Sequence, residues 1–387
     1  MDKVSLLRCN SYDLEKVEAS LRKGFDLLGG DSFLKKIIPY NKKLMLKPNL
    51  LSIENKNSVV VTNPVVFEAA IRIFKDYTSS IYFGDSPGFG DSIKAAEKCG
   101  LMEVAKKYNV EFKPFKDSVH VTLEDSILVK SWTLAKDAYE ADILISLPKL
   151  KTHAMAFYTG AIKNQFGCVP GTLKASWHTR MPQAENFSRM LLDLNKAVGT
   201  DFAILDGIIA MEGNGPKNGT PKKMDTIIMG ESLTAIDSIA TSLIGYEDPL
   251  EVPILKAAYE TKSGSVLRKD IEVLGEKIDD MKVKDFKLSR KGGNFYFISP
   301  KVTSVMRNAL APDPFVLEDK CISCKRCYEV CPEKPKVISM VEKNNKIIPK
   351  WDMSKCIRCF CCQELCPVGA IDTKYKVIAK VLKMDKR

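Results

Sequence analysis

Short apolar segments alternate with amphipathic ones from about residue 40 to residue 250. Residues 141–147 form a continuous apolar run of the kind found in buried parallel strands. Apolar side chains at helical spacing follow Asn63-Pro64, where a proline suits the first turn of a helix. The expected strands are 43–50, 80–83, 141–147, 202–206 and 226–229, and the expected helices begin near 64 and 233 and span about 91–108 and 182–197. Strands that alternate with helices predict a layered α/β domain with a largely parallel sheet.

Eight cysteines near the end of the chain fall into two runs with the same spacing. Each run reads C-x2-C-x2-C-x3-C-P, the first from Cys321 and the second from Cys356. This is the spacing of bacterial-type ferredoxin sites for [4Fe–4S] clusters, in which the fourth cysteine of each run crosses to the other cluster. The pattern assigns one cluster to Cys321, Cys324, Cys327 and Cys366, and the other to Cys356, Cys359, Cys362 and Cys331.

Zinc is the alternative cofactor for these cysteines, because Cys₄ zinc sites also use paired C-x2-C segments. A zinc site requires neither the third cysteine at the same spacing nor the proline after the fourth cysteine in both runs. The repeat therefore favours two [4Fe–4S] clusters over zinc. Cys361 fits no ligand position, and we expect it to be a packed thiol.

Composition changes along the chain divide it into four expected parts. Glycines and prolines gather at 290–316, which is typical of a connection between domains. We expect an α/β domain at 1–300, a linker at 301–316, a small α+β ferredoxin-like domain with two [4Fe–4S] clusters at 317–373, and a basic amphipathic tail at 374–387.

The net charge of +11 at pH 7 raises the question of a nucleic-acid partner. The lysines are spread along the chain, and no basic run is interleaved with aromatic residues, so we expect no nucleic acid. A redox partner protein with an acidic surface suits the charge better. The chain has no apolar run of about 18 residues, so no transmembrane segment is expected. Twelve cysteines without an export signal predict a reducing, cytoplasmic and anaerobic setting.

Polar residues follow the apolar run 141–147, at the strand end where parallel sheets bind ligands. Two lysines and a histidine stand at alternate positions, residues 149, 151 and 153. A lysine and an asparagine, 163 and 164, lie in a glycine-bounded loop, and Glu212 begins a later loop. The candidate catalytic residues are Lys149, Lys151, His153, Lys163, Asn164 and Glu212. We expect the lysines and the histidine to line one pocket for an anionic small molecule, with the histidine as proton donor. The alternative is that these side chains point apart and only solvate the loop.

A second glycine-rich turn, residues 84–90, joins an expected strand to an expected helix. Such a turn can bind an anion at the helix N-terminus. It matches neither G-x-G-x-x-G nor a Walker sequence, so a plain tight turn is an equal alternative. No nicotinamide site of the Rossmann type is expected, whereas a flavin or another organic cofactor stays open.

Four segments of the large domain resemble the family known as domain of unknown function 362: 148–153, 159–164, 166–171 and 212–216. The resemblance spans most of residues 40–300, and members of that family commonly carry a ferredoxin module, as here. It implies no particular reaction. A fainter likeness is to the lactate racemase family, and it implies a cofactor-bearing lysine at Lys163.

Three functions are compatible with these patterns. The first is an iron–sulfur protein that carries low-potential electrons through its two clusters to a partner or acceptor. The second is a reductase whose α/β domain binds an anionic substrate or cofactor and is supplied by its own clusters. The third is a non-redox binding module with structural clusters. The first is the expected function, and the other two are the alternatives.

Overall fold

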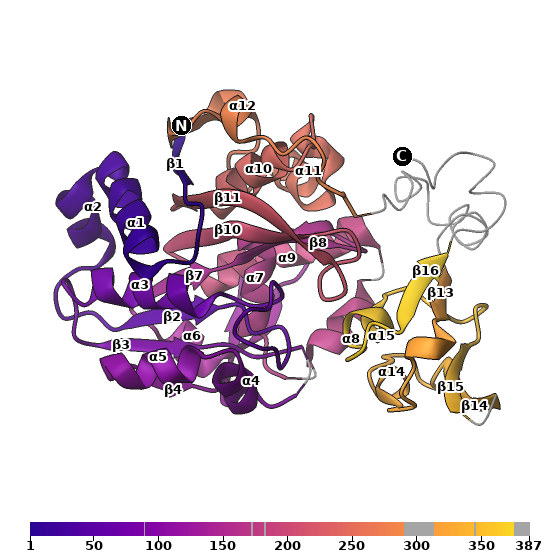
Figure 1. Ribbon diagram of the computed structural model, residues 1–387. Coiled ribbons are helices and arrows are strands. Elements are labelled where there is room, and N and C mark those ends of the chain that lie inside the picture. Colours follow the sequence, from indigo (N-terminus) through magenta and orange to yellow (C-terminus); the bar gives the residue numbers. More distant parts are fainter. Residues whose placement is uncertain (89, 172, 182, 290–312, 344–345, 375–387) are drawn as a thin grey trace.

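A ten-stranded sheet organises the large domain in the computed structural model, which describes residues 1–88, 90–171, 173–181, 183–289, 313–343 and 346–374 (Figure 1). Its strands are β1 (Asp2–Arg8), β2 (Leu44–Pro48), β3 (Ile81–Gly84), β4 (Glu111–Lys113), β7 (Ile143–Leu147), β8 (Lys149–His153), β9 (Phe157–Thr159), β10 (Phe202–Glu212), β11 (Thr220–Gly230) and β12 (Ile271–Gly275).

The strand order is β12-β1-β11-β10-β7-β2-β3-β4, with β8 and β9 added beside β10. Strands β10, β7, β2, β3 and β4 run parallel to one another, and β8 is parallel to β10. Only β11 and β9 run against this direction among the sheet strands described. The predicted α/β class with a largely parallel sheet is therefore confirmed.

Helices cover both faces of this sheet, and each face has its own apolar core. Alternate residues of β7 enter the two cores, because successive side chains of a strand point to opposite faces. One core takes in α1 (Leu14–Leu28), α2 (Gly30–Ile37), α3 (Pro64–Phe74), α4 (Ser92–Lys98) and α5 (Leu101–Tyr108). The other takes in α6 (Lys136–Tyr139), α7 (Ala161–Asn164), α8 (Leu173–Arg180), α9 (Ala184–Val198), α10 (Leu233–Leu243), α11 (Pro253–Glu260) and α12 (Ile278–Met281). A hairpin of β5 (Ser118–Thr122) and β6 (Ser131–Ala135) packs on this second core.

Local structure departs from the sequence prediction at three places. The helix expected over 91–108 is two helices, because Gly100 adopts φ +87° between α4 and α5. The segment after β7, expected as a loop, is the strand β8. Strands β10 and β11 each have 11 residues, so they extend well beyond the apolar stretches that predicted them.

The C-terminal module is small and built on two antiparallel strand pairs. Strand β13 (Asp313–Val316) pairs with β16 (Ile371–Lys374), and β14 (Ile338–Lys343) pairs with β15 (Lys346–Trp351). The cysteine runs form the short helices α14 (Arg326–Glu329) and α15 (Cys361–Glu364). Residues 313–316, expected in the linker, are thus paired within this module, while 301–312 and 375–387 lie outside the described residues. No helix in the described part of the chain is long and apolar enough to cross a membrane.

Candidate functional site

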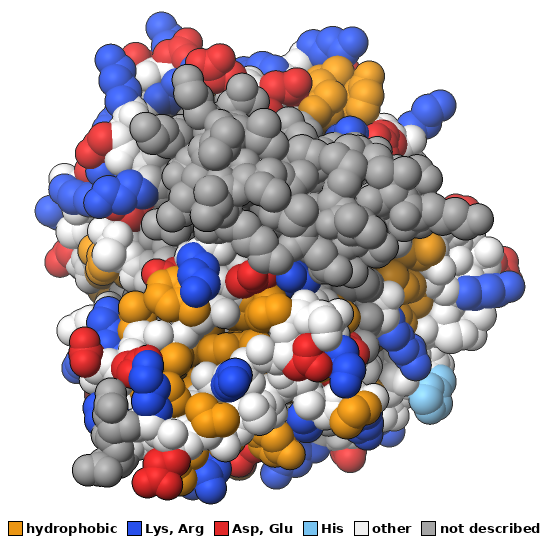
Figure 2. All heavy atoms as spheres, turned by 90° about the vertical axis from the view of Figure 1, so that its right-hand side faces the viewer, with side chains coloured by type: hydrophobic (Ala, Val, Ile, Leu, Met, Phe, Trp, Pro, Cys, Tyr) orange, Lys and Arg blue, Asp and Glu red, His pale blue; other side chains and the backbone are white. Residues whose placement is uncertain are grey.

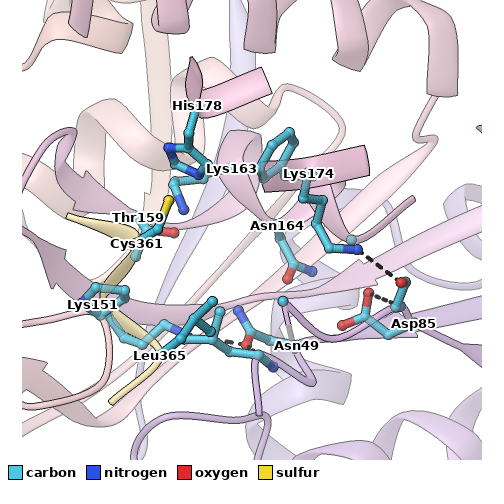
Figure 3. A pocket seen from close by; sticks show the side chains of 16 residues that line it. Asn49, Asp85, Lys151, Thr159, Lys163, Asn164, Lys174, His178, Cys361 and Leu365 are labelled. Atoms are coloured by element: carbon cyan, nitrogen blue, oxygen red, sulfur yellow. Dashed lines mark hydrogen bonds between the residues drawn. The ribbon is translucent and has the colours of Figure 1, made fainter. Parts of the chain in front are cut away.

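A cavity lies where the C-terminal module meets the carboxyl ends of β2 and β3 (Figure 3). Its volume, counted as the space open to the centre of a water-sized sphere, is about 80 Å³. Strand ends of a parallel sheet are where α/β proteins bind ligands. The lining residues are Asn49, Leu51, Asp85, Ser86, Gly88, Lys151, Thr159, Lys163, Asn164, Phe166, Gly167, Lys174, His178, Pro216, Cys361 and Leu365.

Three of the residues singled out in the sequence line this cavity. The Lys151 ammonium donates to the Val60 carbonyl at 2.8 Å and to Asn49 Oδ1 at 3.3 Å. The Asn164 amide donates to Ser146 Oγ at 2.9 Å. Lys163 lies one residue before Asn164 on α7 and is only partly buried. Both lysines therefore line the same space.

A buried carboxylate on α10 positions the short helix that carries Lys163 and Asn164. Asp237 accepts hydrogen bonds from the backbone N–H groups of Ala161 at 2.7 Å and Ile162 at 2.9 Å, and from the Tyr158 hydroxyl at 2.9 Å. Burial raises the pKa of Asp237 to about 7, against the effect of these donors. Asp237, which the sequence analysis did not select, thus fixes the first turn of α7.

The other three candidates lie outside the cavity, which corrects the expectation of a single pocket. Lys149 pairs with Asp206 at 2.7 Å, and both side chains are buried. The His153 ring is fully buried and accepts backbone N–H groups on Nδ1 within its own turn, at 3.0 and 3.1 Å. Glu212 accepts the Lys287 N–H at 2.9 Å. The register of β8 against β10 shifts between Asp206 and Met211. Lys149 and Lys151 therefore have different neighbours, although they stand at alternate positions of one strand.

A buried ion pair that the sequence analysis missed supports the cavity from the sheet side. Lys47 Nζ lies 2.8 Å from Asp85 Oδ1, and both side chains are almost fully buried. Asp85 also accepts the backbone N–H groups of Leu50 at 2.6 Å and Ser86 at 2.9 Å. A Cβ on Gly167 would lie 1.9 Å from Asp85 Oδ1, so this position requires glycine. The turn 84–90 is therefore part of the site, through Asp85 and Ser86.

Lys174, on α8, is the second group that the sequence analysis missed. Its ammonium donates to Ser86 Oγ at 2.8 Å and to the Val169 carbonyl at 2.6 Å, and the residue is 7% exposed. Burial lowers the pKa of Lys174 to about 7; Asp85 opposes the shift, and Lys47 adds to it. Within the described residues, no carboxylate lies within ion-pair distance of this nitrogen. Lys174 is thus a cavity amine that changes charge near neutral pH.

His178 lines the cavity one helical turn after Lys174. Its ring stacks on Phe187, with centroids 4.7 Å apart, and meets the edge of Phe166 at 5.7 Å. In Figure 3 the Cys361 sulfur is directed toward the side chains of His178 and Lys163. Cys361, which fits no ligand position in the sequence, therefore forms part of the cavity wall.

The thiols of the C-terminal module gather in two groups. Burial, and then the nearby thiols of Cys324, Cys366 and Cys321, raises the pKa of Cys327 to about 11. Burial likewise raises the pKa of Cys356 to about 11, and its neighbours include Cys359 and Cys331. The remaining ligand candidate, Cys362, has Cys359 and Cys356 among its neighbours. A donor set of eight thiols arranged in this way fits two [4Fe–4S] clusters.

The two thiol groups differ in their exposure to solvent. Cys324 is exposed and Cys321 is partly exposed, whereas Cys359 and Cys362 are buried. Arg358, beside the second group, forms a buried ion pair with Asp313 at 2.9 Å. The charge of Arg358 is therefore balanced by Asp313.

Polar contacts join the module to the loop between β10 and β11. Asn218 Nδ2 donates to the Gln363 carbonyl at 3.0 Å, and Asn214 Nδ2 donates to Asp372 Oδ1 at 3.3 Å. The Gln363 amide also donates to Asn214 Oδ1. The segment 212–216 thus contacts α15 and β16, and Figure 1 shows α8 and α15 at this junction.

Comparisons with known proteins agree with this two-part organisation. A family model described as domain of unknown function (DUF362) matches residues 44–242, and a 4Fe-4S dicluster domain model matches residues 320–370. A protein of Synechocystis sp. described as thylakoid-associated is 35% identical over 255 residues, which cover 66% of this chain and 78% of that protein.

Solved structures show weaker likeness. The lactate racemase apoprotein from Thermoanaerobacterium thermosaccharolyticum aligns with a TM-score of 0.39 and 14% identity, over 60% of this chain and 54% of that one. A Thermotoga maritima protein aligns with a TM-score of 0.37 and 12% identity, over 57% of this chain and 56% of that one. The chain thus spans just over half the length of these structures. By the match over residues 44–242, the chain belongs to the DUF362 family, and a 4Fe-4S dicluster domain follows that region.

Proposed function

We propose that this chain is an iron–sulfur oxidoreductase that reduces a small anionic acceptor held in the cavity between its two domains. The observation that carries the proposal is the composition of the cavity wall. Cys361 and Leu365 belong to the cysteine-rich module, and each is adjacent in sequence to a proposed cluster ligand, Cys362 or Cys366. Lys151 and Lys163 of the α/β domain line the same space.

The eight cysteines of the two runs are the proposed cluster ligands, in the crossed assignment of Cys366 to the first group and Cys331 to the second. Two bound [4Fe–4S] clusters would supply one-electron transfers at low potential. The thiol neighbourhoods of Cys327 and Cys356 support the assignment. The proposal also requires a reducing compartment such as the cytoplasm, where thiolates remain available as ligands.

The α/β domain contributes binding and orientation. Lys151, Lys163 and Lys174 offer ammonium groups to an anion, while Asn49 and Asn164 offer amides whose positions are fixed by buried hydrogen bonds. Phe166 and Leu365 exclude water from part of the wall. Such a mixture of apolar surface and convergent polar groups is typical of small-molecule sites.

The test is single-turnover reduction of candidate anionic acceptors by the anaerobically purified, prereduced protein. We expect Lys163→Ala to slow reduction at least tenfold while the visible spectrum of the clusters stays unchanged. The matched control is Lys35→Met, at an exposed lysine of α2 that pairs with Asp31. Equal rates in Lys163→Ala and in the unmodified protein, for every acceptor that is reduced, would contradict the proposal.

The cluster assignment has its own measurement. The unmodified protein should contain about eight iron and eight sulfide per chain, as expected for two four-iron clusters. Cys359→Ser should lose about half of both, whereas Cys361→Ser should keep the full content. Stoichiometric zinc without sulfide would overturn the iron–sulfur assignment.

A second candidate function, an electron carrier for an acidic redox partner, is favoured by the exposed end of the module. Cys324 is exposed there, and Ile322 is 59% exposed, next to the charged residues Lys325 and Arg326. Figure 2 views this end of the molecule and shows hydrophobic side chains among Lys and Arg side chains, with Asp and Glu interspersed. Such a surface suits docking of an acidic protein.

Charge reversal tests this carrier function. Lys325→Glu/Arg326→Glu should shift the potential of one cluster downward in anaerobic voltammetry, because nearby positive charge stabilises the reduced state. It should also slow electron exchange with an acidic ferredoxin at low salt. An upward shift, or exchange that does not depend on salt, would count against this function. Lys163→Ala distinguishes the two functions. It should slow electron transfer in a reductase and leave the rate of electron transfer unchanged in a carrier.

A further inference from the structure

We propose that Lys174 is the acid–base residue of the cavity: it takes up a proton when an anionic ligand enters and holds that proton beside the ligand. That the ligand is a substrate rests on the proposed function. Proton uptake on binding needs no electron transfer. Lys174 lines the cavity, is 7% exposed, and projects from α8 toward the turn that contains Ser86.

The hydrogen bonds of Lys174 leave its charge uncompensated. Its two acceptors, Ser86 Oγ and the Val169 carbonyl, are neutral groups, and they fix the nitrogen at 2.8 and 2.6 Å. An ammonium and a neutral amine can both donate these two bonds. The geometry therefore holds the nitrogen in place in either protonation state, which is what a residue that gains and loses a proton requires.

In the described part of the chain, the charged groups around Lys174 offer its ammonium no free carboxylate. Asp85 is the acidic neighbour, but Lys47 pairs with it at 2.8 Å. The Cys168 thiol is fully buried, and burial raises its pKa to about 12, so it stays neutral near pH 7. The cavity lining adds the basic side chains of Lys151, Lys163 and His178.

In this setting a proton on Lys174 is unfavourable in the empty cavity and favourable once an anion is present. Burial already brings its pKa to about 7, so about half of the molecules carry the proton at pH 7. An anion within the cavity raises that pKa, because an opposite charge nearby stabilises the charged form. Binding therefore takes up part of a proton per ligand, and that part grows as the pH rises from 6 to 8.

Isothermal titration calorimetry of the oxidised holoprotein measures this uptake directly. The probes are sulfate and oxalate, which both keep a constant charge between pH 6 and pH 8 and which distinguish an oxyanion site from a carboxylate site. Titrations in buffers of different ionisation enthalpy give the number of protons from the slope of the measured enthalpy. We expect uptake to rise from pH 6 to pH 8 as stated, for at least one probe.

Variants identify the residue that takes up the proton. Lys174→Met should bind the probe more weakly and show no uptake, whereas Lys35→Met should behave like the unmodified protein. Lys174→Arg keeps a permanent charge, so it should bind without uptake. Unchanged uptake in Lys174→Met, with loss of uptake in His178→Phe, would overturn the assignment to Lys174.

Other outcomes remain decisive for the proposal. If Lys174→Met does not fold, a pH-independent proton count in the unmodified protein is enough to overturn it. Failure of both probes to bind at millimolar concentration would overturn the anion site. None of these readouts depends on acceptor reduction, so a redox-inactive protein that shows the uptake would refute the proposed function alone.

Discussion

Lys149 and Lys174 are both buried lysines near strand ends of one domain, yet their surroundings are opposite. Lys149 lies 2.7 Å from the Asp206 carboxylate and 2.5 Å from the Tyr12 hydroxyl, outside the cavity. Lys174 has only neutral acceptors and lines the cavity. A buried ammonium needs either a paired carboxylate or the option of losing its proton. The first solution yields a structural residue, and the second yields a chemically available amine.

The largest expected effect lies on the structural side of this comparison. Lys149→Met should lower the free energy of unfolding by about 3–5 kcal/mol, because it leaves the Asp206 carboxylate buried without its partner. Chemical denaturation followed by far-UV circular dichroism measures the loss. The double variant Lys149→Met/Asp206→Leu should recover much of it. If Lys149→Met unfolds within 1 kcal/mol of the unmodified protein, the two lysines are not as different as the structure indicates.

On the cavity side, Gly167→Ala should have the next largest effect. The added methyl would meet Asp85 Oδ1 at 1.9 Å and Lys47 Nζ at 2.6 Å, and neither buried side chain has room to move away. We expect destabilisation near the upper end of the ~1–3 kcal/mol typical of overpacked sites, with weaker anion binding. Gly88→Ala, where the nearest atom is an ordinary 3.4 Å away, is the matched control. Similar losses in both variants would argue against a rigid Lys47–Asp85 pair.

The pH dependence of stability should next identify Lys174 as a titrating group. The pKa of Lys174 is lowered to about 7 in the folded state, so between pH 7 and about 10 the unfolded chain binds more protons at this residue. The free energy of unfolding therefore rises with pH in this window, by about 2 kcal/mol from pH 7 to pH 9. Lys174→Met should lack this rise, so its difference from the unmodified protein should grow with pH, whereas Lys35→Met should show the rise and differ from the unmodified protein by a constant. Parallel curves for all three proteins would show that Lys174 titrates normally.

The smallest expected effect is that of Lys174→Met on stability at pH 7. The substitution removes the cost of burying an ammonium but leaves Ser86 Oγ and the Val169 carbonyl without a donor. These contributions oppose each other, so we expect a change of less than about 1 kcal/mol. Thermal denaturation of the holoprotein measures it. A loss as large as that of Lys149→Met would make Lys174 a structural residue as well.

The elements that the sequence predicted well are those whose signal is local. The apolar run 141–147 became β7, and Asn63 caps α3 with Pro64 in its first turn. Cys366 lies near Cys327, and Cys331 lies near Cys356, as the crossed order of the two cysteine runs predicts. Gly100 lies inside a helical pattern, and its positive φ, which splits the predicted helix, is set by the turn between α4 and α5.

The cavity was only partly predictable, because its members meet through the tertiary fold. Lys47 lies within the strand β2, and its partner Asp85 follows β3, so only the alignment of the parallel strands brings them together. Lys149 and Lys151 look alike in the sequence, and the register shift of β8 against β10 separates them. The position of Lys174 depends on α8, whose neighbours are set by the second core.

The place of β1 in the sheet has a consequence for how the protein is made. This strand precedes every other strand of the sheet in the sequence, but it lies between β11 and β12, with Val4 beside Gly230 and Asp2 beside Ile271. At about 5–20 residues per second, a ribosome needs roughly 13–55 s after making β1 to deliver its last partner. Val4, Leu6 and Leu7, buried in the folded protein, have no strand beside them before β11 is made. The edge of the sheet beyond β1 closes only when β12 follows, shortly before the cysteine-rich module is translated.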